Sequence, residues 1–323
     1  MDGQDHSDLD AGPLDNHHGS QAAPSLPAEI ECDIFTIAYH QDRENVMNLL
    51  TVSKRISKWI ISLIYEVVAF SGSPPMKHPP LENLQRYGHH VKHLLLSLNF
   101  KKFPPPIDEG AILRSCPNIS DLVLGIGCTS SVALFDLPLK RLALLEHETT
   151  RFEDQIEYLR QTNDEKYRRW SSNITHIAWE SLSLSSCQTT LAPAFLNLTH
   201  FLIGYWNVYL LQKGIVDYMV ESFRALEVLV VLLETPGAEI IGLEEVDSLL
   251  EQDRAQELSE AEIIMEPGVI YSLFGVEFED PRVVMIKSRF VTNWVEGARG
   301  GDGLWAVAEQ AVKERRRRVS GLL

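Results

Sequence analysis

The chain has 323 residues, of which 45% are hydrophobic and 23% charged, and its formal net charge is −16. These proportions are ordinary for a soluble globular protein. The acidic balance argues against nucleic acid as the main partner, because binding to phosphates requires a basic face. The length accommodates one or two domains, or a small module followed by an elongated one.

The cysteines and the apolar segments indicate an intracellular protein. The cysteines are Cys32, Cys116, Cys128 and Cys187. Because they lie far apart and form no CxxC pair, we expect reduced, packed thiols and no zinc site. The first 21 residues contain no Lys or Arg and no apolar core, so we expect no secretory signal. The most apolar run, Trp59–Phe70, is too short to span a bilayer, which favours a cytoplasmic or nuclear protein without a membrane partner.

Composition divides the chain into five stretches. Residues 1–24 are acidic and rich in Gly, His and Asp, and we expect a disordered tail there. Residues 25–70 carry helical signals, and the proline-rich residues 71–80 cannot continue a helix and are typical of a linker. Residues 81–317 form the main domain, and residues 318–323 are a short tail.

The helical stretch has the pattern of three short amphipathic helices. Pro27 suits the first helical turn, because proline needs no N–H partner there, and Ile30 and Ile34 recur at helical spacing. Ser53 can cap the third helix, which carries Trp59. Three helices this close together make a bundle too small to be very stable alone, so we expect its stability to depend on contact with a partner or with the next domain.

An irregular repeat of the form Φ-x-x-Φ-x-Φ, where Φ is apolar, follows the linker. Its central residues are Leu94, Leu122, Leu142, Ile177, Phe201 and Leu229. Each unit predicts a short strand preceded by a helix or turn. Stacked units of this size resemble leucine-rich repeats, so the predicted fold is α+β to α/β: a helical module followed by an irregular leucine-rich-repeat-like α/β solenoid. An ordinary α/β sandwich is the alternative.

Three Asn-x-Ser/Thr motifs begin at Asn118, Asn173 and Asn197. Each asparagine stands just before the first apolar residue of a predicted strand. We therefore expect these side chains to satisfy free backbone groups in the turns rather than to carry glycans.

The end of the domain departs from the repeat. Residues 238–262 form an acidic insertion, which is either a solvated excursion or a docking element for a basic ligand. Arg282–Ile286 predicts a last strand, and Leu304–Arg317 predicts a closing helix that caps the end of the solenoid. The basic run Lys313–Arg318 suits a helix C-terminus; a nuclear-import patch or a phosphorylation site at Ser320 are the functional alternatives.

A search for catalytic motifs is largely negative. The sequence has no GxSxG, HExxH or GxxxxGK[ST] pattern. Gly297–Gly303 precedes a helix but lacks the lysine of a phosphate-binding loop, which predicts a flexible turn. His89 and His93 lie four residues apart and could share a helical face, but they lack the glutamate of a zincin. We expect a non-catalytic protein without a cofactor or a metal.

Two stretches carry the motifs of a known family. The first, Leu26–Val68, opens with LPAEI, continues to Ile34-Phe35 and runs through LLTVSK to Trp59. The second, Trp294–Trp305, contains WVEGARGG. Together they resemble the expanded F-box-like proteins of mushroom-forming fungi. An F-box is a short helical module that docks a protein onto the Skp1 adaptor of a cullin ubiquitin ligase.

The resemblance implies a substrate-recruiting, non-catalytic subunit of a Skp1–cullin–F-box ubiquitin ligase. The repeat domain would bind a protein target of unknown identity. The implied Skp1-binding residues are Leu26, Pro27, Ile30, Ile34, Leu49, Leu50, Val52 and Trp59. Asp42–Asn45 lengthens the first connection, and Ile56-Ser57 replaces a bulky basic or aromatic residue of many F-boxes. These departures would weaken docking and leave an alternative open, an interaction scaffold with a degenerate F-box that does not bind Skp1.

Overall fold

The computed structural model divides the chain into two compact units between Ile60 and Ile61. The residues that it describes are 26–42, 46–71, 81–97, 108–125, 132–145, 149–162, 164–179, 190–205, 213–233, 263–264, 280–287 and 290–321. The acidic tail predicted for residues 1–24 and the acidic insertion at 238–262 lie outside these ranges, as does the predicted linker except for Ser71. Within the described ranges, no helix is long and apolar enough to cross a membrane.

The first unit contains helices where the sequence predicts them: α1 (Ala28–Gln41), α2 (Val46–Val52) and the beginning of α3 (Lys54–Ile64). Pro27 stands directly before α1, and the Ser53 hydroxyl accepts a hydrogen bond from the Ile56 N–H at 3.2 Å, which caps α3. An ion pair between Glu31 and Arg55 connects α1 to α3. The predicted cap at Ser53 is therefore confirmed.

The second unit is built on a single sheet. Among the described residues it has nine strands in the order β1-β2-β3-β4-β5-β6-β7-β9-β8. They are β1 (Val67–Ser71), β2 (His93–Ser97), β3 (Asp121–Leu124), β4 (Arg141–Leu144), β5 (His176–Trp179), β6 (His200–Tyr205), β7 (Val228–Leu233), β8 (Ile263–Ile264) and β9 (Val283–Lys287). Neighbouring strands pair in parallel except β8, which is antiparallel to β9. The chain is thus of the mixed α/β class, and β1 places residues 67–70 in the sheet although the sequence assigned them to the helical stretch.

The predicted central residues of the repeat occupy equivalent positions in this sheet. Leu94 is the register partner of Leu122 and Leu122 of Leu142, and the series continues through Ile177 and Phe201 to Leu229. All six side chains are buried in one core cluster. The apolar spacing in the sequence therefore predicted these strands correctly, and the structure pairs their central residues with one another.

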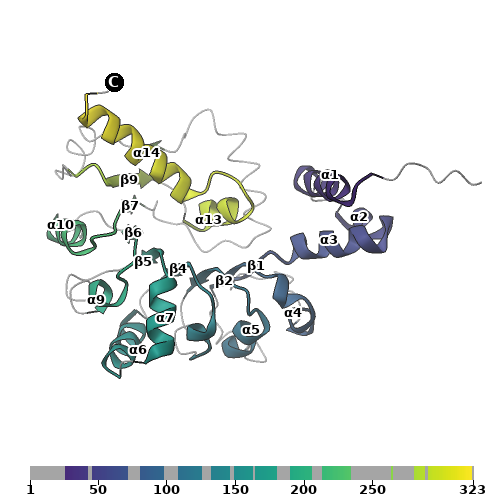
Figure 1. Ribbon diagram of the computed structural model, residues 1–323, viewed down its shortest axis with the longest axis horizontal. Coiled ribbons are helices and arrows are strands. Elements are labelled where there is room, and N and C mark those ends of the chain that lie inside the picture. The colour runs from purple at the N-terminus through teal and green to yellow at the C-terminus, as the bar shows by residue number, and fades with distance from the viewer. Residues whose placement is uncertain are drawn as a thin grey trace, which may run out of the picture. The chain divides into compact units, whose positions relative to one another are not determined.

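One face of the sheet packs against the helices that alternate with the strands (Figure 1). These elements are α4 (Leu81–Tyr87), η1 (Gly88–His90), α5 (Glu109–Ser115), η3 (Val132–Asp136), α6 (Thr149–Gln161), α7 (Glu165–Asn173), α9 (Ala192–Ala194) and α10 (Lys213–Ser222). Two of the predicted turn asparagines link successive units. The Asn118 amide donates to the His89 carbonyl at 2.7 Å, and the Asn197 amide donates to the Ser172 carbonyl at 2.9 Å.

The opposite face packs against α13 (Phe290–Ala298) and α14 (Leu304–Val319) (Figure 1). Small side chains on both sides, such as Ala143 and Ala178 of the sheet and Ala308 and Ala311 of α14, belong to this second core cluster. The closing helix was expected to cap the end of the solenoid, and that expectation was wrong because α14 lies against the face of the sheet.

Candidate functional site

Helix α1 presents an apolar stripe to solvent. Leu26, Ile30, Ile34 and Ile37 are each 47–55% exposed, and none of the residues of α1 is buried. Ile30, Ile34 and Ile37, at spacings of four and three residues, lie on one side of α1, and Leu26 lies two residues before the helix begins. We call these four residues the α1 stripe.

The other residues predicted for Skp1 binding divide into two groups. Pro27 and Val52 are exposed, whereas Leu49, Leu50 and Trp59 are partly buried. The Arg55 guanidinium lies 5.5 Å from the centroid of the Trp59 ring, at the distance of a cation–π contact. The second group therefore contributes to the packing of the unit as well as to its surface.

The sequence-based prediction missed two exposed apolar residues of the first unit. Met47 is 69% exposed, and Ile37 belongs to the α1 stripe. Ile37 could have been included, because it continues the helical spacing from Ile34. No periodicity distinguished Met47.

In the second unit, the first residues of five neighbouring strands form a polar row under α13 and α14. The row consists of His93, Asp121, Arg141, His176 and His200, which are register partners in turn. The sequence analysis did not identify the row, although each member directly precedes a central residue of the repeat. It noted that His93 and His89 could share a helical face but favoured surface or strand-edge positions, and His93 begins β2 whereas His89 lies in η1.

Asp121 organises one end of the row. Its Oδ1 accepts a hydrogen bond from the Trp294 indole N–H at 3.0 Å, and its Oδ2 lies 3.3 Å from His93 Nδ1. The Arg141 guanidinium approaches the same Oδ2 to 3.7 Å. Three side chains therefore stabilise the negative charge of the buried Asp121 carboxylate. One of them, Trp294, attaches α13 to the sheet through it.

His176 and His200 occupy the other end and stack on each other. The ring centroids are 4.1 Å apart and the planes differ by 7°, and the plane of the Trp305 ring is nearly perpendicular to both. Burial, with the neighbouring His200 and Arg141, lowers the pKa of His176 to about 3. Burial also lowers the pKa of His200, against the opposite effect of Glu309. Both rings are consequently neutral at neutral pH.

A cavity of about 170 Å³ lies between the row and the α13–α14 hairpin. Asp121 and Arg141 line it from the sheet, and Trp305 and Glu309 line it from α14. It therefore gives small molecules access to the polar row.

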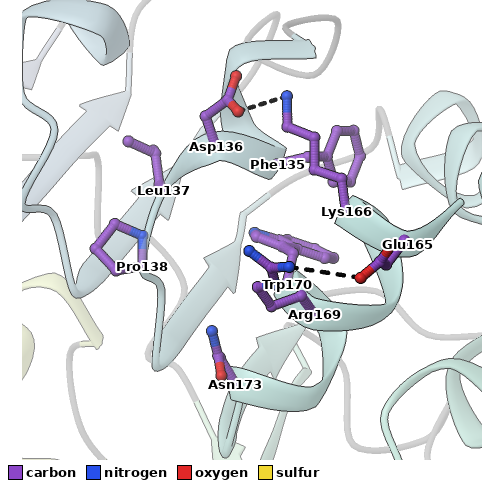
Figure 2. Close-up of a pocket in the computed structure, with 9 residues that line it drawn as sticks. All are labelled: Phe135, Asp136, Leu137, Pro138, Glu165, Lys166, Arg169, Trp170 and Asn173. Atoms are coloured by element: carbon purple, nitrogen blue, oxygen red, sulfur yellow. Dashed lines mark ion pairs between the residues drawn. The ribbon is translucent and has the colours of Figure 1, made fainter.

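A larger pocket of about 510 Å³ lies on the other side of the sheet, between η3 and α7 (Figure 2). Phe135 and Trp170 give it an aromatic wall. Its rim carries two exposed ion pairs, Lys166 with Asp136 at 2.5 Å and Arg169 with Glu165 at 3.6 Å. The pocket therefore combines apolar surface with charges of both signs.

His200 has a polar neighbour at each ring nitrogen: the Thr199 hydroxyl lies 2.8 Å from Nδ1, and Glu309 Oε1 lies 3.3 Å from Nε2. The Thr199 hydroxyl also lies 3.1 Å from the Thr175 carbonyl, which already accepts two backbone N–H groups. Comparisons of the chain with protein-family models, curated proteins and solved structures find no match.

Proposed function

We propose that this protein is a substrate-recruiting adaptor subunit of a Skp1–cullin–F-box ubiquitin ligase. In this proposal the helices of the first unit bind a Skp1-like adaptor, and the second unit binds the protein to be ubiquitinated. The chain itself performs no chemistry. It increases the rate of transfer by holding the target near the ubiquitin-charged enzyme.

The observation that carries the proposal is the α1 stripe. A 14-residue helix with no buried residue gains little from packing within its own unit, so its apolar side chains are available to a partner. Full burial of one isoleucine contributes about 1.5–3 kcal/mol. Leu26, Ile30 and Ile34 of the stripe are also residues that the F-box resemblance assigns to Skp1 binding.

The topology of the second unit supports an interpretation as an irregular leucine-rich-repeat-like solenoid. Strands β1 to β7 follow each other in the sheet in chain order, as expected when each repeat contacts only its neighbours. Because α13 and α14 cover one face of this sheet, the pocket between η3 and α7 is the better-supported site for a target side chain (Figure 2).

Co-expression with Skp1 from the same organism, followed by size-exclusion chromatography, tests the proposal. We expect a one-to-one complex with the unmodified chain. The double variant Ile30→Asp/Ile34→Asp should elute separately from Skp1, since each buried charge costs about 2 kcal/mol or more, roughly 30-fold in affinity.

Leu196→Asp is the matched control, because Leu196 is an apolar residue of the second unit that is 76% exposed. This variant should retain the complex. Separate elution of two folded proteins with the unmodified chain would reject the adaptor role. It would favour the alternative, a non-catalytic scaffold with a degenerate F-box, which the partial burial of Leu49, Leu50 and Trp59 also fits.

A further inference from the structure

Three potential metal ligands converge at the histidine end of the polar row. His176 and His200 come from adjacent strands and Glu309 from α14, and one ligand atom of each lies within 4.8 Å of the others. Metal chemistry does not follow from proximity alone, because neighbouring polar groups can also satisfy one another. The hydrogen bonds around the two rings decide which nitrogen is available.

The threonines next to the two histidines can serve either ring tautomer. Each hydroxyl lies 2.8 Å from the Nδ1 of the following histidine. The Thr199 hydroxyl also lies 3.1 Å from the Thr175 carbonyl, and the Thr175 hydroxyl 3.4 Å from the Lys140 carbonyl, and each of these carbonyls already accepts two backbone N–H groups. In the tautomer with Nδ1–H, the hydroxyl accepts from the ring and the lone pair of the neutral ring is on Nε2.

His200 Nε2 is buried and lies 3.3 Å from Glu309 Oε1. In the tautomer with Nε2–H, the ring donates its hydrogen to this carboxylate. In the tautomer with Nδ1–H, both atoms are acceptors and repel each other unless a cation lies between them. A metal ion can supply that charge.

We propose that His176, His200 and Glu309 bind a divalent transition-metal ion, with Zn²⁺ as the first candidate. Two imidazoles and a carboxylate form a known set of zinc ligands, and an imidazole that binds zinc usually donates its other N–H to an outer acceptor, as Thr175 and Thr199 provide here. The stacked rings must tilt so that both lone pairs reach one ion at about 2.0–2.1 Å. The adjacent cavity leaves room for water as a fourth ligand.

The surrounding charges nearly balance. Arg141 lowers the pKa of both histidines and would also oppose a bound cation, but its guanidinium is shared with Asp121 at 3.7 Å. Glu227 adds negative charge near His200. Lys313 approaches Oε2 of Glu309 at 3.9 Å and leaves Oε1 directed at His200.

The test uses the full chain without a histidine tag, stripped of metal with a chelator and dialysed. Titration with Co²⁺ should give the visible absorption bands of tetrahedral Co²⁺, saturating at one equivalent and disappearing when Zn²⁺ is added. Zn²⁺ should raise Tm, because it binds the folded state, and Mg²⁺ should not, because it prefers oxygen ligands.

The chain has 11 histidines, including His176 and His200. Variants are needed to assign the signal to this site rather than to one of the others. Glu309→Gln should abolish the tetrahedral bands, and Thr199→Val should weaken binding about 10–100-fold. Glu314→Gln, the same change on the same helix, should leave them intact. Circular dichroism confirms that each variant is folded. Absence of the bands, or bands that persist in Glu309→Gln, would overturn the proposal and assign the contact between His200 and Glu309 to a proton.

Discussion

Trp294 donates its indole N–H to the carboxylate of Asp121, which lies 173 positions earlier in the chain, at 3.0 Å in a buried setting. The contact joins α13 to β3 across a face of the sheet. Near the C-terminal end of α14, Arg316 donates to the Glu227 carbonyl at 3.2 Å, and Arg315 donates to the carbonyl of Val283. The C-terminal helices are thus attached to the sheet at both ends of the hairpin.

Asp121→Asn should lower the free energy of unfolding by about 2 kcal/mol, because hydrogen bonds and ion pairs to a buried charged group are lost. The amide would also turn a donor toward Arg141 or Trp294. Urea unfolding followed by circular dichroism measures the change. Asp136→Asn is the matched control: Asp136 pairs with Lys166 but is 63% exposed, so its loss should cost less than about 1 kcal/mol. Equal costs for the two variants would contradict the structural role of Asp121.

The sequence predicted the strands better than the helical cover. Apolar spacing identified the strands that carry Leu94, Leu122 and their equivalents, because the side chains that face the helices must be apolar in every unit, and the structure pairs these residues in register. The position of α14 could not be predicted in this way. Ala308 and Ala311 of α14 pack against the sheet face whose residues alternate with the central residues of the repeat. The strands that form this face lie far from α14 in the chain, so no local sequence pattern could predict that they pack together.

The candidate sites show the same division. Local helical spacing put Ile30 and Ile34 on one face of a helix, and the family resemblance made them candidate binding residues. The polar row was missed because its members differ in chemistry, from His93 to Asp121 and Arg141, and they become neighbours only through strand pairing. An alignment of the repeats would have placed them in one column.

Cys116 should react with thiol reagents only after unfolding. It is fully buried, and burial raises the pKa of its thiol to about 12. Because the thiolate is the reactive form, a variant that keeps only Cys116 should be labelled slowly at pH 8 in the native state and rapidly in urea. A variant that keeps only Cys32, which is partly exposed, is the control and should be labelled faster without urea. Equal native rates would contradict the burial of Cys116.

The same thiol gives an alkaline dependence of stability. Between pH 9 and about pH 12 the unfolded chain loses the Cys116 proton while the folded chain keeps it. The folded state then binds more protons, so its stability falls as the pH rises, by at most about 1.4 kcal/mol per pH unit. Urea unfolding at several alkaline pH values should show a smaller slope for Cys116→Ala than for the unmodified chain.

The glycines between α13 and α14 are required by close packing rather than by flexibility alone. A Cβ on Gly303 would lie 2.6 Å from the Gly297 Cα and 3.3 Å from the Asn293 carbonyl oxygen, all of them backbone contacts. Gly303→Ala should therefore push the two helices apart and cost about 1–3 kcal/mol. It should also change the near-ultraviolet circular dichroism of Trp294 and Trp305, which lie on the two helices.

Gly300→Ala separates this packing effect from backbone strain. Gly300 has a φ of +88°, but no atom lies within 4 Å of the site that a Cβ would occupy. The variant should cost about 1–2 kcal/mol, because an L-residue is strained at positive φ, and it should keep the near-ultraviolet spectrum of the unmodified chain. If Gly303→Ala also kept that spectrum, the close approach of Gly297 and Gly303 would not determine the packing of the two helices, since displacement of α14 must alter the surroundings of Trp305 against His176 and His200.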